Sequence, residues 1–116
     1  MDSISKECLD KALKGLKNGN YKLVKDTYFT TGNVYLEIGD FKNDELVNVI
    51  TVNVLPLGSD EYICVDTNNC TYATTLLEKL KIAEDTGYTN SSGYCVYPIY
   101  KLNNDELEKY LVKEAA

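Results

Sequence analysis

The stretch Val47–Val54, written VNVITVNV, contains five valine and isoleucine side chains and carries them on both faces of an extended chain. Ile50, Val52 and Val54 point to one side, and the two valines before them point to the other. A strand that is apolar on both faces is typical of the middle of a sheet, because a half-exposed strand alternates between apolar and polar residues. We therefore expect residues 47–54 to form a central strand.

The patterns before this stretch predict one helix and two strands. Apolar residues at helical spacing follow the N-cap candidate Ser3, and Gly19 suits the left-handed position after a helix. From Tyr21 the period changes to two, which predicts strands at Tyr21–Thr30 and from Val34 to Ile38. The links between these strands are short, which favours an antiparallel meander.

The second half of the chain predicts two more helices around one strand. After a short strand at Tyr62–Asp66, apolar residues of one face predict a helix over Cys70–Leu80, capped by Asn68 or Asn69. The polar, glycine-containing segment 83–93 reads as a surface loop. Tyr94–Leu102 reads as a strand, and Pro98 places it at an edge or makes it irregular because proline has no amide hydrogen.

Asn103, with Glu106 three residues later, resembles a capping box at the start of a last helix. The predicted fold is therefore one α+β domain over residues 1–116, in the order α-β-β-β-β-α-β-α. Its four- or five-stranded, mostly antiparallel sheet has two helices on one face and the C-terminal helix at a side or end.

Composition indicates a cytoplasmic protein without cofactors. No apolar run is long enough for a membrane span, and the N-terminus is too charged for a secretory signal. The four cysteines, Cys8, Cys64, Cys70 and Cys95, would suit two disulfides in a secreted module, but here we interpret them as reduced, small core residues. No CxxC pair and no histidine occur, so we expect no metal site.

The net charge of −6 arises from 18 acidic residues and 12 lysines, without any arginine. Direct binding to nucleic acid is disfavoured, since phosphates require a basic surface. An acidic surface can instead imitate phosphates and occupy a nucleic-acid-binding protein, although most such charge only keeps a domain soluble.

Catalytic patterns are few. Without histidine there is no Ser–His or Cys–His nucleophile pair, and the glycine-rich phosphate-binding motifs do not occur. Asp66, Asn68 and Cys95 could surround a small-ligand or catalytic site, because active-site acids often lie between a strand and a helix. Alternatively, Asp66 closes an Asx turn or caps the helix.

Four tyrosines, Tyr88, Tyr94, Tyr97 and Tyr100, crowd the segment GYTNSSGYCVYPIY. Tyrosine offers a large, rigid contact area with a polar tip, so this set is a candidate interaction surface. The alternative is that tyrosines simply suit a half-buried sheet.

The strings DTNN at Asp66–Asn69, TG at Thr86-Gly87 and SGYCVYPIY at Ser92–Tyr100 resemble a family of small uncharacterised proteins. These proteins, a domain of unknown function, are encoded on conjugative and other mobile elements of gut Firmicutes and related bacteria. The resemblance covers Val65–Leu102 and implies a genomic setting without a mechanism.

We therefore expect a non-catalytic protein-interaction module of a bacterial mobile element. Its Tyr94–Tyr100 strand would contact a protein partner, with no direct binding to nucleic acid or membrane. One alternative is an acidic, nucleic-acid-mimicking inhibitor of a host defence protein. The other is a small-ligand-binding protein or enzyme with a site near Asp66, Asn68 and Cys95.

Overall fold

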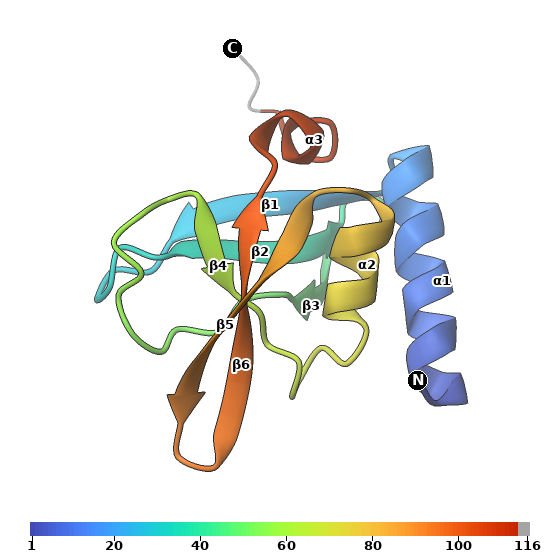
Figure 1. The fold of residues 1–116 in the computed structure, drawn as a ribbon. Coiled ribbons are helices and arrows are strands. Elements are labelled where there is room, and N and C mark those ends of the chain that lie inside the picture. Colours follow the sequence, from blue (N-terminus) through green and yellow to red (C-terminus); the bar gives the residue numbers. More distant parts are fainter. Residues whose placement is uncertain (114–116) are drawn as a thin grey trace.

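The computed structural model describes residues 1–113 and contains three helices and six strands (Figure 1). In chain order these are α1 (Ser3–Asn18), β1 (Tyr21–Thr27), β2 (Val34–Asp40), β3 (Glu45–Val49), β4 (Tyr62–Cys64), α2 (Ala73–Lys79), β5 (Ala83–Ser92), β6 (Cys95–Leu102) and α3 (Asn104–Glu108). The α+β class is confirmed, and all strand pairs between these elements are antiparallel. The predicted order lacked one strand, because segment 83–93 was interpreted as a loop.

The strands form two three-stranded sheets rather than one meander. The first has the order β1-β2-β3, and the second has the order β4-β6-β5. Helix α1 packs against β1 and α2, and α2 packs against β5, so both helices lie on the same side of the molecule (Figure 1). One continuous apolar cluster joins the helices to both sheets, and its fully buried members include Leu23, Leu36, Ile63, Leu76 and Leu77.

The prediction of a central strand over residues 47–54 is wrong. β3 ends at Val49 and lies at an edge of the first sheet, where its side chains are half-buried or exposed. Beyond it the chain crosses between the sheets: the Ile50 amide donates to the Leu36 carbonyl (2.9 Å), and the Ile50 carbonyl accepts from the Asp66 amide (2.8 Å). The apolar residues on both faces therefore reflect a crossing between two sheets, with Ile50 fully buried there.

Strand β6 occupies the middle of the second sheet, so the predicted edge position is wrong. The alternative prediction, an irregular strand, agrees with the register shift of its pairing with β5 between Pro98 and Tyr100. Pro98 fits there because its carbonyl accepts from the Val65 amide (3.0 Å), just beyond Cys64, the last residue of β4. In antiparallel pairing the nitrogen and carbonyl of one residue face the same neighbour. The missing amide hydrogen of Pro98 therefore falls where pairing with β4 has ended.

The helix termini agree only in part with the sequence patterns. Asp2, not Ser3, caps α1 by accepting from the Ser5 amide (2.7 Å), while Gly19 follows that helix with the predicted positive φ. Helix α2 begins at Ala73, later than predicted, and has no side-chain cap. Asn103 caps α3 as predicted, through the Glu106 amide (3.3 Å).

The outer edges of the sheets differ in how they are covered. The chain after α3 lies beside β1, where the Leu23 amide donates to the Tyr110 carbonyl (2.8 Å) and the Leu23 carbonyl accepts from the Val112 amide (2.9 Å). Residues 50–52 lie beside the end of β4, which is one outer strand of the second sheet, and the Thr51–Val65 bridge holds them there. Within residues 1–113, β5 pairs with β6 alone, so its outer edge is free.

Candidate binding surface

The β5–β6 hairpin extends beyond the other elements of the fold (Figure 1). Its turn contains two residues, Gly93 and Tyr94, between the paired residues Ser92 and Cys95. Positive φ occurs at Gly93 but not at Tyr94, which is the pattern of a type II′ turn. That turn twists as the strands do and places the side chain of Tyr94 at the tip.

The predicted tyrosine set separates into two exposed and two buried side chains. Tyr94 is fully exposed and Tyr88 is 75% exposed. Tyr97 and Tyr100 are buried, and the Tyr100 hydroxyl lies 3.3 Å from the Glu78 carboxylate of α2. Burial, followed by the charge of Glu78, raises the pKa of Tyr100 to about 12. A partner can therefore reach Tyr88 and Tyr94, whereas Tyr97 and Tyr100 are packing residues.

The candidate ligand residues Asp66, Asn68 and Cys95 are not brought to one cavity. Asp66 is buried, and its carboxylate accepts from the amide (3.1 Å) and the side chain (2.9 Å) of Asn69. Asp66 thus closes the turn after β4 through the amide three residues on, as a capping residue does, which agrees with the structural alternative for Asp66. Asn68 is exposed and Cys95 half-buried, and none of the three lines either depression described below.

Tyr97 is buried and lies near two members of that predicted ligand set. The pKa of Tyr97 is raised first by the Cys95 side chain and then by burial, with a smaller effect of the Asp66 charge. The neighbour that Cys95 and Asp66 share is therefore a buried tyrosine.

A β-bulge interrupts β5 and shapes its outer face. The register with β6 shifts between Asp85 and Thr89, and Gly87 takes a φ of +83° there. The Thr86 hydroxyl donates to the Ile99 carbonyl (2.7 Å) and accepts from the Tyr88 amide (3.1 Å). These bonds replace the interrupted ladder and hold Tyr88 in its position, as bulges do when they redirect a side chain.

Beside the bulge, the outer face of the second sheet has an open depression of about 410 Å³. Its apolar part comes from Leu57, Tyr62, Tyr88 and Ile99. The loop that carries Leu57 is fixed by the buried Asn33. The Asn33 side chain accepts from the Leu57 amide (2.9 Å) and donates to the Leu55 carbonyl (2.8 Å). The depression is therefore built from the second sheet and from a loop that Asn33 anchors beside the start of β2.

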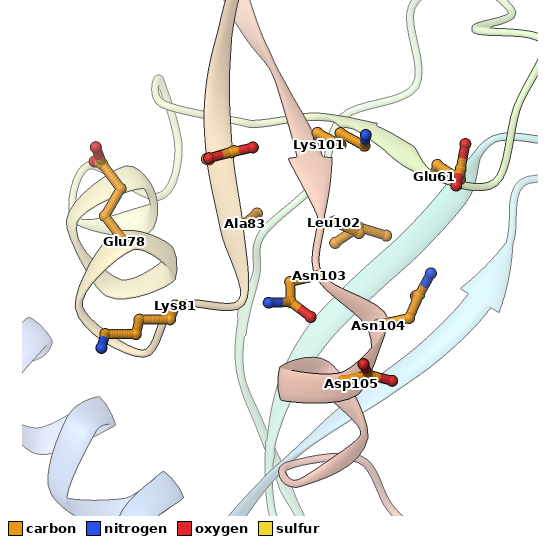
Figure 2. A pocket seen from close by; sticks show the side chains of 10 residues that line it. Glu61, Glu78, Lys81, Ala83, Lys101, Leu102, Asn103, Asn104 and Asp105 are labelled. Carbon is orange, nitrogen blue, oxygen red and sulfur yellow. The ribbon is translucent and has the colours of Figure 1, made fainter.

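Charged residues surround this depression. Glu84, Asp85 and Lys101 line it, and Glu84 and Lys101 also line a second, adjoining depression of about 620 Å³ (Figure 2). Within residues 1–113, Lys109–Glu106 forms the one ion pair, so the charges of both depressions are not neutralised by such pairs.

The sequence does not predict this surface, because the polar residues of segment 83–93 are typical of a loop. The segment forms β5 despite its polar composition. The Ser-Gly-Tyr sequence directly before β6 is a signal for a hairpin turn. A hairpin turn requires a partner strand upstream, and the bulge at Gly87 would then follow as the irregular point of that strand.

Two further searches of residues 1–113 gave negative results. No helix there has the length and hydropathy to cross a membrane. In the same residues, no group of three or more Cys, Asp or Glu side chains is placed to hold a metal ion.

The fold and this surface define a small α+β domain with an exposed hairpin, an irregular outer strand and charged depressions beside it. A family model described as Domain of unknown function (DUF4313) matches residues 23–115, and the chain belongs to this family. The match extends well beyond Val65–Leu102, where the resemblance was noticed. Comparisons with curated proteins and with solved structures gave no match.

Proposed function

We propose that this domain is a non-catalytic protein-interaction module, and that it contacts its partner through the exposed side of the β5–β6 hairpin. The observation that carries the proposal is the full exposure of Tyr94 at the tip of a hairpin that extends from the fold. Tyr88 and Val96 are exposed on the same hairpin.

These exposed side chains contribute little to the stability of the domain, since none belongs to the apolar core. Aromatic side chains are enriched at the centres of protein interfaces, where they bury a large area with little loss of side-chain freedom. A rigid two-residue turn presents Tyr94 in a preformed position, which reduces the entropy lost on binding. The hairpin thus has the properties of a contact element.

The proposal includes a cytoplasmic module that serves a bacterial mobile element. Its support is the resemblance of SGYCVYPIY, which in the structure spans the hairpin turn and most of β6. The same string therefore supplies both the structural tyrosines and the exposed Tyr94.

A capture experiment tests the proposal. The parent chain, Tyr94→Ala and Phe29→Ala would be immobilised and exposed to an extract of the native host. Phe29 is a matched control, because it is also a fully exposed aromatic side chain, but in the turn between β1 and β2. We expect Tyr94→Ala to lose the captured protein and Phe29→Ala to retain it. Equal capture by all three chains would refute the role of the hairpin.

A second candidate is an acidic inhibitor that imitates nucleic acid. It is favoured by the net charge of −6 and by the scarcity of ion pairs within residues 1–113, which leaves carboxylates free to act on a basic site. This candidate predicts inhibition of a DNA-binding protein that weakens steeply with salt, since exposed charges are screened. Inhibition that does not depend on salt would exclude it.

A further inference from the structure

The depression beside the β5 bulge combines aromatic walls with carboxylates. We propose that it binds a lysine or arginine side chain from an extended basic segment of the protein partner. This inference rests on the proposed function, because it names the chemistry of the partner that the hairpin contacts. It is carried by the shape of the depression and by its charge.

The apolar walls suit the stem of a long cationic side chain. Tyr62 and Ile99 form part of the sheet surface, Leu57 approaches from the loop before β4, and Tyr88 closes the side at the bulge. Lysine and arginine bury their methylene groups against such surfaces while the charged end stays hydrated. Tyrosine rings also attract a cation through their faces.

Two consecutive acidic residues line the same depression. Glu84 and Asp85 both line it and are exposed, so neither is desolvated before a ligand arrives. The Asp85 carboxylate accepts from the Gly87 amide (2.9 Å), which fixes it at the bulge near Tyr88. A cation that packs against Tyr88 would therefore have a carboxylate beside it.

The adjoining depression extends the same charge pattern. It shares Glu84 and Lys101 with the first depression and adds further charged residues from the loop before β4, from α2 and the chain after it, and from α3. Over both depressions, the lining includes five acidic residues and two lysines: Glu61, Glu78, Glu84, Asp85 and Asp105, with Lys81 and Lys101. This excess of negative charge is complementary to a segment that carries more than one basic residue.

The positive charge of Lys101 repels the cation of a bound ligand and therefore limits where that cation can lie. Figure 2 shows the Lys101 side chain extending from β6 toward Glu61. Glu61 lies just before β4, on one side of β6, whereas Asp85 and Tyr88 lie in β5, on the other side. We therefore place the bound cation at the β5 side.

Other occupants fit the same surface less well. An acidic segment or a nucleic acid strand would meet the excess of carboxylates. A second copy of this chain, joined edge to edge through β5 around a two-fold axis that passes beside this depression, would bring Glu84 and Asp85 toward the same residues of its partner. Like charges directly opposite each other destabilise strand pairing.

The test uses a fluorescent peptide of alternating lysine and threonine, with glutamate–threonine and glutamine–threonine peptides of equal length for comparison. The variant Glu84→Gln/Asp85→Asn removes both carboxylates but keeps the oxygen that accepts from the Gly87 amide. Its matched control is Glu45→Gln/Asp26→Asn, which has the same net charge. Asp26 is also exposed and also accepts from a nearby backbone amide (2.8 Å).

We expect the lysine peptide to bind the parent chain, and to bind the Glu84→Gln/Asp85→Asn variant roughly five- to twentyfold more weakly, since two exposed ion pairs are lost. The control variant should bind within about twofold of the parent, because it changes only the distant field. Circular dichroism melting of both variants would show that they fold.

Three outcomes would overturn the inference: no binding of the lysine peptide, equal weakening by both variants, or preference for the glutamate peptide. Concentration-dependent dimers that the Glu84→Gln/Asp85→Asn variant stabilises would also overturn it, in favour of a second copy. If Tyr94→Ala loses the captured host protein while the carboxylate variant retains it, the proposed function stands and this inference fails. If the carboxylate variant binds the lysine peptide more weakly but Tyr94→Ala captures the host protein as the parent does, the inference stands and the role of Tyr94 fails.

Discussion

Replacing Gly15 by alanine should destabilise the domain, although helix propensity alone predicts the opposite. Gly15 lies in the last third of α1, and alanine is favoured over glycine inside a helix by about 1 kcal/mol. A Cβ atom at Gly15, however, would overlap the Cγ and Cδ2 atoms of Tyr21 and lie 3.0 Å from its Cβ. Tyr21 begins β1 and is buried, so its ring has little room to move.

Insertion of a methyl group into a packed site destabilises by about 1–3 kcal/mol. We expect a value near the upper end at Gly15, because the contact involves the base of the ring rather than the end of a flexible side chain. After subtraction of the propensity gain, the net loss is about 1–2 kcal/mol, and the melting temperature should fall by about 4–8 °C for a domain of this size.

Urea denaturation followed by circular dichroism measures this loss. Lys14→Ala, at an exposed position of the same helix, is the control and should stay within about 0.5 kcal/mol of the parent. In a Tyr21→Ala background the ring is absent and only the Cβ contact remains, so Gly15→Ala should lose most of its destabilising effect. A stabilising effect in the parent chain, or the same effect in both backgrounds, would show that the contact with Tyr21 does not decide the sign.

The remaining predictions concern the loop anchor and the buried thiols. Asn33→Ala should lower the free energy of unfolding by about 1–2 kcal/mol, measured by urea denaturation, and increase amide exchange at Leu57, because two hydrogen bonds to the loop are lost. In the native chain at neutral pH, a thiol reagent should modify Cys8 and leave Cys64 and Cys70 unmodified until urea is added, because burial raises the pKa of each buried thiol to about 11; rapid reaction of either buried thiol would contradict this. The two buried thiols keep their protons in the folded chain up to about pH 11, whereas the same thiols ionise near pH 9.0 in the unfolded chain. The free energy of unfolding should therefore fall between about pH 9 and 11, which melting curves across that range would show.

Elements whose apolar residues repeat at a local period were predictable from the sequence. Helix α1 follows its apolar stripe, and β1 and β2 follow their period of two, because each of these elements buries one side against the core. Strand β5 has no such signal. Most of its side chains are exposed, and its extended state depends on pairing with β6 and on the turn at Gly93.

The stretch 47–54 shows the same limit in another form. Its valines and isoleucine predicted a central strand, but this pattern is the same for a central strand and for a chain that crosses between two sheets, as it does at Ile50. The crossing depends on the Ile50 and Thr51 contacts with β2 on one side and Val65 and Asp66 on the other. These partners are distant in sequence and have no local signature.

The tyrosine set was found from the sequence, but the accessibility of its members was not. Alternation would place Tyr97 and Tyr100 on opposite faces of a strand, so one of them should face solvent. Both are buried, so β6 is covered on both faces at these two positions. Tyr94 is exposed for a different reason, since it lies in the turn.

The composition of β5 serves two purposes that can be separated. Charged residues and a bulge on an outer strand prevent pairing with other chains, and Glu84, Asp85 and Gly87 fit that role without any ligand. Edge protection does not require an aromatic side chain at Tyr88, whereas the proposed cation site does. Tyr88→Thr keeps the strand propensity and the charges but removes the aromatic wall. If edge protection is the whole explanation, this variant will bind the lysine peptide as the parent does and stay monomeric; weaker binding by a monomeric variant would assign the aromatic ring to recognition.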